Sequence, residues 1–476
     1  MSEGATPTGV RERSSVAEGP ARGRAASVAA LVVAVASTVG LLCFAPRHSN
    51  VTAMLTLVTT AACGALTLLE LRHRSLGVAP IAVGIVVVMG VAVAVPPHTS
   101  NDLWSYGTYG RMVVEYHADP YTRTPSEFAS DPIARHVSPI WRHRSSVYGP
   151  LWVGVAGVGA AVAGTDPTAL RLFFQLLAAL AAALTLLVLW RVTRSPVPIA
   201  WLGLHPVFVA NSVNNGHADV VIGLAVLAGA LLAARHRPGL AGAAIGVVAL
   251  IKVTALLGLV GIVLWSWRAR ARRAALVSAG AAVGVLVLGY LPILHAATRV
   301  LENADHTVTV ASPWNPLADL LVGRDAGRAL RHPLAFNPTL DTLFFCGGVL
   351  VVVLALTLGW RAAAARDPRP AAGTASAAYP LGAAYSYPWY ADWALPSLAT
   401  GRPTPLAWVV WLQSAVMLAA VHLHIHPTGR LADELLRFPL TDVLPLAFLV
   451  AFVVTGVTRA RASEGTQGGE IPVAAR

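Results

Sequence analysis

Long stretches without a charged residue constrain the fold of this 476-residue chain more than any other feature. Several of them reach the ~20 residues that a helix needs to cross about 30 Å of hydrocarbon. Backbone N–H and C=O groups in lipid must be hydrogen-bonded within the spanning element, so the sequence predicts an all-α, polytopic transmembrane helical bundle. The stretches are Ala26–Phe44, Val51–Leu69, Val78–Val95, Leu172–Trp190, Val220–Ala234, Ala274–Leu294, Leu343–Trp360, Leu406–Ala420 and Val443–Val457.

The amount and the placement of charge fit this class. Charged residues make up 12% of the chain, about half of what soluble domains carry. The mean hydropathy is +0.62. Much of the net charge of +12 comes from arginines in short connectors between the apolar stretches, such as Arg72 and Arg74. The positive-inside rule places such connectors on the cytoplasmic face, so the charge does not indicate a nucleic-acid partner.

Both ends of the chain differ from the apolar middle. Residues 1–25 are rich in Gly, Ser, Arg and Glu, and residues 461–476 are polar as well. Neither has an apolar period, which indicates disordered tails. We therefore expect one membrane domain over 26–460 and, from the arginine connectors, both termini in the cytoplasm of a multi-pass protein of the cell membrane.

The same orientation places two long segments, 97–147 and 295–341, on the external face. Long connections in compact domains are commonly functional, and we expect short interfacial helices in both. The helix count is ambiguous in two other places. Residues 148–190 have the apolar length for two crossings but charges that favour one, which suggests a re-entrant or interfacial helix. Residues 239–265 fit two short helices that turn near Lys252.

An acidic residue stands at the start of the first external segment. Asp102 follows an apolar stretch by a few residues, and a carboxylate there is costly unless it is paired or faces a water-filled cavity. Two interpretations are open. Asn101 or Asp102 begins an external helix that runs through Arg111, or Asp102 is a catalytic acid. Trp104 and Tyr106 follow in the same motif.

Further polar and aromatic clusters fall on the same face. Tyr121 in Asp-Pro-Tyr and Tyr148 in Tyr-Gly-Pro-Leu-Trp are typical of turns with interfacial aromatic residues. His217 and Asp219 belong to Asn-Asn-Gly-His-Ala-Asp, which fits a tight turn with Asp219 in the first turn of the next helix. The rings of 387–393, Tyr-Pro-Trp-Tyr-Ala-Asp-Trp, fit stacking on a sugar and an aromatic belt equally well.

Lys252 is the only lysine among 35 lysine and arginine residues, and it lies in an apolar stretch. It either extends its ammonium group to the interface or is held for a phosphate or for a buried acid such as Asp219 or Asp392. His422 and His426 would share a helical face, but no third ligand has a recognisable spacing. We therefore predict a helix end there and no metal site.

Taken in order along the chain, these motifs resemble the GT-C superfamily of membrane glycosyltransferases, which use polyprenyl-phosphate sugars. They look most like actinobacterial polyprenol-phosphomannose-dependent α-1,6-mannosyltransferases, from about Ala26 to Ala460. The resemblance implies a GT-C-like bundle of roughly 12–14 membrane helices and Asp102 as the catalytic carboxylate. The candidate substrate-binding residues are Trp104, Tyr106, Arg111, Tyr121, Tyr148, His217, Asp219, Lys252, Trp389, Tyr390 and Trp393.

The chain departs from the family pattern at three positions. Asp119 stands where the first-loop motif usually has Asn, and Ala218 replaces the central Asn of Asn-Gly-His-Asn-Asp. Asp392 is an acid where an apolar residue is common. These departures leave the sugar and the acceptor open.

The implied chemistry suits these residue types. A polyprenyl phosphate is a good leaving group, so the enzyme needs a general base, for which Asp102 is the candidate, and a cation for the departing phosphate, for which Arg111, Arg123 or Lys252 are candidates. We expect an inverting transfer of a mannosyl residue to a glycolipid or polysaccharide acceptor on the outer face of the membrane, without a cofactor. The rival class is a transporter or flippase of a lipid-linked sugar. It fits less well because the chain shows no convincing repeat of its two halves.

Overall fold

The structure is a computed structural model that describes residues 15–44, 49–97, 99–303, 307–323, 337–425, 435 and 437–465. Every regular element in these ranges is helical, and the all-α bundle predicted from the sequence is confirmed. The longer helices are α1 (Ser15–Phe44), α2 (Ser49–His73), α3 (Val78–Ala94), α4 (Asp102–Val114), α5 (Pro150–Ala163), α6 (Pro167–Thr193), α9 (Asp219–Ala234), α10 (Pro238–Ala249), α11 (Leu256–Arg268), α12 (Arg272–Tyr290), α15 (Pro338–Ala362), α16 (Arg369–Gly382), α18 (Pro405–Ile425) and α20 (Leu444–Gly465).

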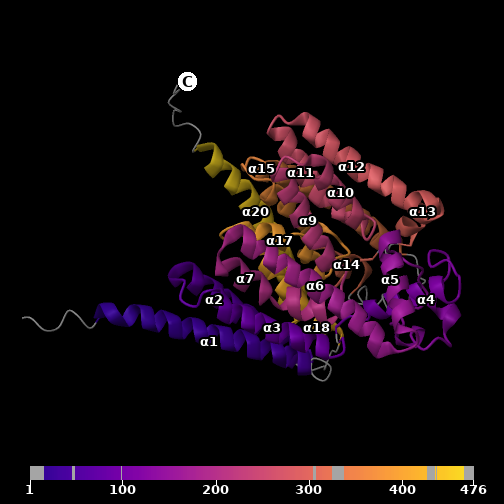
Figure 1. Cartoon of the computed structure of the whole chain (residues 1–476), viewed down its shortest axis with the longest axis horizontal. Helices are drawn as coiled ribbons and strands as arrows, with labels where there is room; N and C mark the ends of the chain where they lie inside the picture. Colours follow the sequence, from indigo (N-terminus) through magenta and orange to yellow (C-terminus); the bar gives the residue numbers. More distant parts are fainter. Residues whose placement is uncertain are drawn as a thin grey trace, which may run out of the picture.

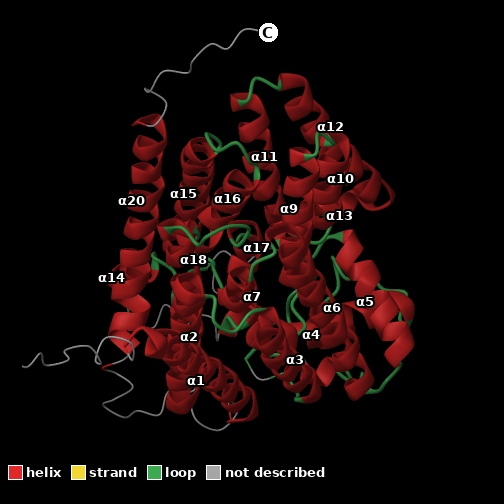
Figure 2. Ribbon diagram, turned by 60° about the vertical axis from the view of Figure 1, so that its left-hand side comes forward, coloured by secondary structure: helices red, strands yellow, loops and turns green. Residues whose placement is uncertain are grey.

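Short helices connect these elements. Among them are α7 (Pro196–Gly203), α8 (Ser212–Asn214), α13 (Leu294–Glu302), α14 (Asn315–Val322), α17 (Leu395–Leu398) and the 3-10 segments η4 (Val253–Ala255) and η7 (Pro388–Trp393). Helices α1, α2 and α3 lie together on one flank, and α10, α12 and α13 lie on the opposite one (Figure 1). Figure 2 shows the same bundle turned, with α20 at its left-hand edge and α15 beside it.

Seven helices in the described ranges are long and apolar enough to cross a membrane. An eighth span arises if the pair Pro196–Gly203 and Pro206–Asn214, bent by 55°, counts as one. Large aliphatic side chains on these helices point outward; Leu288 of α12, for example, is 71% exposed, as a lipid-facing side chain would be. A multi-pass membrane protein is therefore confirmed. The count of roughly 12–14 crossings stays a prediction, because it depends on whether the shorter apolar helices also span.

Both segments of ambiguous helix count hold a pair of helices. Residues 148–190 contain α5 and most of α6, which Asp166 caps with its side chain. Residues 239–265 contain α10 and α11, which meet at Lys252, so the predicted turn at this lysine is confirmed.

The ends of the chain differ from the expected tails where they are described. Helix α1 begins at Ser15, inside the segment 1–25, and α20 runs to Gly465, inside the segment 461–476. Residues 1–14 and 466–476 lie outside the described residues.

Small residues set the helix spacing around the site. A Cβ atom on Gly223 of α9 would lie 2.0 Å from the carbonyl oxygen of Asp392, so only glycine lets η7 approach α9 this closely. A Cβ on Gly149 would lie 2.3 Å from the carbonyl oxygen of Leu250. Both contacts bring polar segments that are far apart in sequence to one place.

Candidate active site

A cavity of about 570 Å³ collects residues from both long segments and from the later helices. Its lining combines two charged residues, Asp102 and Lys252, with aromatic rings and with an aliphatic part. The aromatic lining residues include Tyr109, Trp141, Tyr148, Tyr379, Tyr385, Tyr387, Trp389, Tyr390 and Trp393. The more apolar part includes Val300, Leu301, Val310, Phe344 and Val421. Such a mixture suits a ligand with a polar head and an apolar tail.

Asp102 is the first residue of α4, as the helix-start interpretation predicted. Its backbone N–H donates to Ser100 Oγ at 3.1 Å, and Asn101 makes no side-chain cap. Burial raises the pKa of Asp102 to about 6, although the nearby Lys252 ammonium opposes this rise. A carboxylate with that pKa is ionised at neutral pH and is a stronger base than an ordinary aspartate, which suits general-base work. Its catalytic role stays a prediction.

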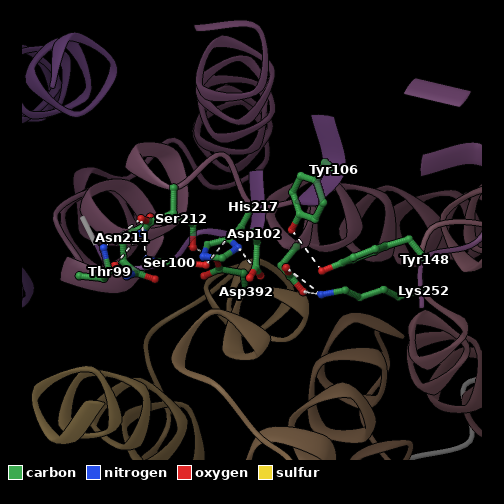
Figure 3. Close-up of polar contacts among 12 residues, drawn as sticks. Thr99, Ser100, Asp102, Tyr106, Tyr148, Asn211, Ser212, His217, Lys252 and Asp392 are labelled. Carbon is green, nitrogen blue, oxygen red and sulfur yellow. Dashed lines mark hydrogen bonds and ion pairs between the residues drawn. The ribbon is translucent and has the colours of Figure 1, made fainter. Parts of the chain in front are cut away.

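His217 faces Asp102 from the turn before α9. Its Nδ1 lies 3.6 Å from Asp102 Oδ2, and its side chain is fully buried (Figure 3). The imidazole stacks on Trp389, with ring centroids 4.0 Å apart, and Trp389 stacks on Tyr387 at 4.7 Å. Burial and the charge of Lys252 hold the pKa of His217 well below its usual value. The imidazole is therefore neutral, and its contact with Asp102 is not an ion pair.

Lys252 forms an ion pair with Asp219. Its Nζ lies 2.9 and 3.1 Å from the two carboxylate oxygens, and Trp393 Nε1 donates to Asp219 Oδ1 at 2.8 Å. The ammonium also lies 4.8 Å from the ring centroid of Tyr390, 5.5 Å from that of Tyr148 and 5.8 Å from that of Trp393. Of the sequence interpretations, the lysine held for the buried acid Asp219 is confirmed. The other named acid, Asp392, accepts a hydrogen bond from Ser212 instead.

Backbone pairing explains why Lys252 lies beside Tyr148. The N–H of Gly149 donates to the carbonyl of Ile251 at 2.9 Å, and that of Leu151 donates to the carbonyl of Leu250 at 3.1 Å. The break between α10 and α11 thus docks on the start of α5. The Tyr-Gly-Pro motif and the single lysine form one structural unit.

Arg111 lies outside the lining of this cavity. Its Nε donates to Asp131 Oδ2 at 2.6 Å and its Nη1 donates to the carbonyl of Gly164 at 2.6 Å. Burial alone would raise the pKa of Asp131, but hydrogen bonds from Arg111 and Tyr116 hold it below its usual value. The guanidinium therefore stabilises the first long segment, and the structure does not bring it to a position where it would meet a substrate in the cavity.

Three predicted aromatic residues also pack outside the lining. Trp104 stacks on His136, with ring centroids 4.7 Å apart. Tyr106 is fully buried, and its hydroxyl contacts that of Tyr148 at 3.5 Å, so it supports a lining residue from behind. Tyr121 packs in a small apolar cluster with Ala296 of α13. Their part in substrate binding stays a prediction.

Sequence reasoning did not select several residues of the site. Tyr379 and Tyr385 line the cavity, and no motif signalled them. Asn215 accepts hydrogen bonds from the backbone before Asp102, and Asn211 donates to the hydroxyl of Thr99 in the same segment. The signal for the asparagines was present, because a run of amide side chains between two apolar stretches must find hydrogen-bond partners inside the protein.

The structure offers no group of three or more His, Cys, Asp or Glu side chains for a metal ion within the described ranges. His422 is buried near the end of α18, and His426 lies outside the described residues. The expectation that the protein needs no cofactor stays a prediction.

The fold and the site together define a multi-pass helical membrane protein with a carboxylate and a lysine in one aromatic-lined cavity. The family model described as "Alpha-(1->6)-mannopyranosyltransferase, N-terminal domain" matches residues 22–270, just over half of the chain, and the protein belongs to this family. The match includes Asp102, Asp219 and Lys252 and ends before the aromatic run 387–393. The resemblance to α-1,6-mannosyltransferases inferred from the motifs is thereby confirmed.

One curated relative gives the same indication over a shorter stretch. The chain is 28% identical to Alpha-(1->6)-mannopyranosyltransferase A of Corynebacterium glutamicum over 169 residues. The matched stretch covers 34% of this chain and 34% of that relative. No solved structure matches the chain.

Proposed function

We propose that this protein is a membrane glycosyltransferase that moves a mannosyl residue from a polyprenyl-phosphate donor to a glycolipid or polysaccharide acceptor. Membership of the α-(1→6)-mannopyranosyltransferase family supports the sugar and the reaction class. The observation that carries the proposal is that Asp102 and Lys252, a base and a cation, line the same cavity. A transfer from a sugar phosphate needs both groups near the reacting carbon.

In this proposal Lys252 binds the phosphate of the donor. An ammonium group has three N–H donors, and Asp219 accepts from it with two oxygens, which leaves donor capacity for a phosphate oxygen. The first isoprene units of the donor would lie against Val300, Leu301 and Phe344, the more apolar part of the lining. The sugar would stack on an aromatic ring of the lining, since the faces of aromatic rings favour the C–H faces of sugars.

Asp102 acts as the general base. The acceptor hydroxyl attacks the anomeric carbon, the bond from that carbon to the phosphate oxygen breaks, and the hydroxyl proton passes to Asp102. The phosphate leaves with its bonding electrons and is held by Lys252. A single displacement inverts the anomeric centre, so a β-linked donor gives an α-linked product.

The arginine connectors support an orientation with the cavity at the outer face and both termini in the cytoplasm. The lipid tail of the donor would then stay in the bilayer while the sugar enters the cavity. A flippase of lipid-linked sugars is the alternative, and the experiment below separates the two.

The test uses membranes that contain the full chain, radiolabelled polyprenyl-phosphate mannose and a short α-mannoside acceptor. We expect labelled product from the wild type, and Asp102→Asn should lower its rate by about 10²–10⁴-fold because the general base is lost. Asp166→Asn is the matched control. Asp166 is an exposed N-cap residue of α6, and asparagine caps equally well. Label that crosses the bilayer without any transfer to mannoside would overturn the proposal in favour of the flippase.

A further inference from the structure

The backbone just before Asp102 is held by a single buried side chain from another part of the chain. Asn215 is fully buried, and its Oδ1 accepts hydrogen bonds from the N–H groups of Thr99 and Ser100, at 3.3 and 3.1 Å. Two successive backbone donors on one amide oxygen fix the direction of the chain there. The hydroxyl oxygen of Ser100 then accepts the N–H of Asp102, the first residue of α4. The start of α4 is thus held in place by Asn215.

The amide nitrogen of Asn215 also bonds to this segment. We call the hydrogen bonds of the Asn215 side chain to Thr99 and Ser100 the Asn215 clamp. It donates to Thr99 Oγ1 and to the carbonyl of Asn211, both at 2.7 Å. Asn211 donates to the same Thr99 Oγ1, also at 2.7 Å (Figure 3). All polar atoms of the Asn215 side chain are therefore used, either on the segment before Asp102 or within residues 211–217, which we call the 211–217 loop.

The same loop reaches the carboxylate of Asp102. His217, two residues after Asn215, lies 3.6 Å from Asp102 Oδ2. Asp102 is held at its backbone through Ser100 and contacted at its side chain, and both interactions trace to the 211–217 loop. Figure 3 shows Asn211 beside Thr99, and His217 beside Asp102.

The loop is anchored independently of Asp102. Asn214 Nδ2 donates to carbonyls at the end of α3, those of Ala92 at 2.9 Å and Val95 at 3.1 Å, and Gln175 Nε2 donates to the carbonyl of Asn214 at 2.7 Å. The hydroxyl of Ser212 donates to Asp392 of η7. Asn214 and Gln175 already satisfy the end of α3, so Asn215 is not needed for that task.

We propose that Asn215 is a positioning residue for the transfer reaction, which sets where the Asp102 carboxylate stands relative to the acceptor hydroxyl. This inference rests on the proposed function. A general base must lie within hydrogen-bond reach of the proton that it removes, and a displacement of about 1 Å costs up to about 10²-fold in rate. Donor binding at Lys252 depends on other elements, α9, α10 and η7, so it should not respond.

The test compares Asn215→Leu with the wild type, both purified as full chains. Leucine has the same branching and the same number of side-chain heavy atoms as asparagine, but it can make none of these hydrogen bonds. We expect kcat to fall about 10–100-fold while the donor KM changes less than about twofold. The acid limb of the kcat–pH profile should move to lower pH, because a displaced Asp102 becomes better hydrated and its pKa falls. His217, Asp219 and Lys252, which also face Asp102, are unchanged in this variant.

A second variant and a control keep the test decisive. Thr99→Val removes the hydroxyl that accepts from Asn211 and Asn215, and it should lower kcat about 3–10-fold with the same direction of pH shift. Thr185→Val removes a buried hydroxyl that bonds only to the carbonyl of Ala181 within α6, and it should change neither quantity. If Asn215→Leu does not fold, Thr99→Val decides by the same criteria.

Three results would contradict the inference. A folded Asn215→Leu variant with wild-type kcat would show that Asn215 does not position Asp102 for the reaction. A fall in kcat with an unmoved acid limb, or a rise in donor KM alone, indicates a structural role only. An inactive wild type instead refutes the proposed function, and the inference with it, so the two failures are distinguishable.

Discussion

Two buried ion pairs of this protein, Lys252–Asp219 and Arg111–Asp131, differ in what surrounds the cation. The side chains of Arg111 and Asp131 are 5% and 1% exposed, and Asp131 also accepts bonds from Tyr116 and from backbone N–H groups. Lys252 is 13% exposed and lines the cavity, whereas Asp219 is fully buried. Arg111–Asp131 is therefore a closed network, and Lys252–Asp219 is open on the side of the cation.

The two cations also differ in the groups that compensate their burial. Arg111 uses its donors on Asp131 and on the carbonyl of Gly164, so its desolvation is compensated locally. Lys252 is compensated by Asp219 and by three aromatic rings, which attract a cation but offer no further lone pairs. An incoming phosphate would complete its coordination.

Within this comparison of the two ion pairs, the largest expected effect on activity comes from replacing Lys252, the cation that lines the cavity. Lys252→Gln should lower kcat/KM for the donor by about 10²–10³-fold, since the charge that we propose stabilises the leaving phosphate is lost. Because this variant also leaves Asp219 buried without its partner, Lys252→Gln with Asp219→Asn is needed. The double variant should regain thermal stability in detergent and stay inactive. Recovery of activity together with stability would show that the pair is only structural.

Replacing Arg111 should have the opposite result, a loss of stability with little change in kcat. Arg111→Gln leaves the buried Asp131 carboxylate without its cation, which costs about 3 kcal/mol of stability. Its kcat, measured on folded protein, should stay within about threefold of wild type, a range that corresponds to less than 1 kcal/mol in the barrier. Arg111→Gln with Asp131→Asn should recover part of the stability. A large loss of kcat at unchanged stability would place Arg111 in the reaction after all.

A smaller effect should follow from Trp393→Phe, which keeps the ring beside Lys252 and removes the N–H that donates to Asp219. The loss of one hydrogen bond to a carboxylate is worth about 1–2 kcal/mol, so we expect kcat/KM for the donor to fall about 5–30-fold. Wild-type kinetics in Trp393→Phe would mean that Lys252 and the ring alone define the site.

The smallest effect concerns pH. The base acts when ionised, so wild-type kcat should rise as pH increases through about 6, the pKa of Asp102. Lys252 lowers this pKa, so the acid limb of the kcat–pH profile of Lys252→Gln should lie at higher pH than that of the wild type. Arg111→Gln should leave the limb in place. A limb that moves in Arg111→Gln and not in Lys252→Gln would reverse the assignment of the two pairs.

Sequence alone was enough for the class of the protein and for the order of its motifs. Apolar stretches of membrane-spanning length leave helices as the economical solution, because each helix satisfies its own backbone hydrogen bonds in lipid. Local signals also predicted a helix start at Asp102, an acid in the first turn of α9, and a turn between two helices at Lys252. The structure has all three. These features depend on neighbouring residues, which a sequence displays directly.

Only the tertiary structure decided which charged and aromatic residues meet. Arg111 and Lys252 were equal candidates for the phosphate in sequence, yet one is closed off by Asp131 and the other lines the cavity. The partners of Lys252, Asp219 and Trp393, are distant in sequence and come together where Gly223 lets η7 approach α9. Asn215 reaches the backbone before Asp102 across a similar distance in sequence. Such pairings depend on how helices pack, and packing is a property of all their faces at once.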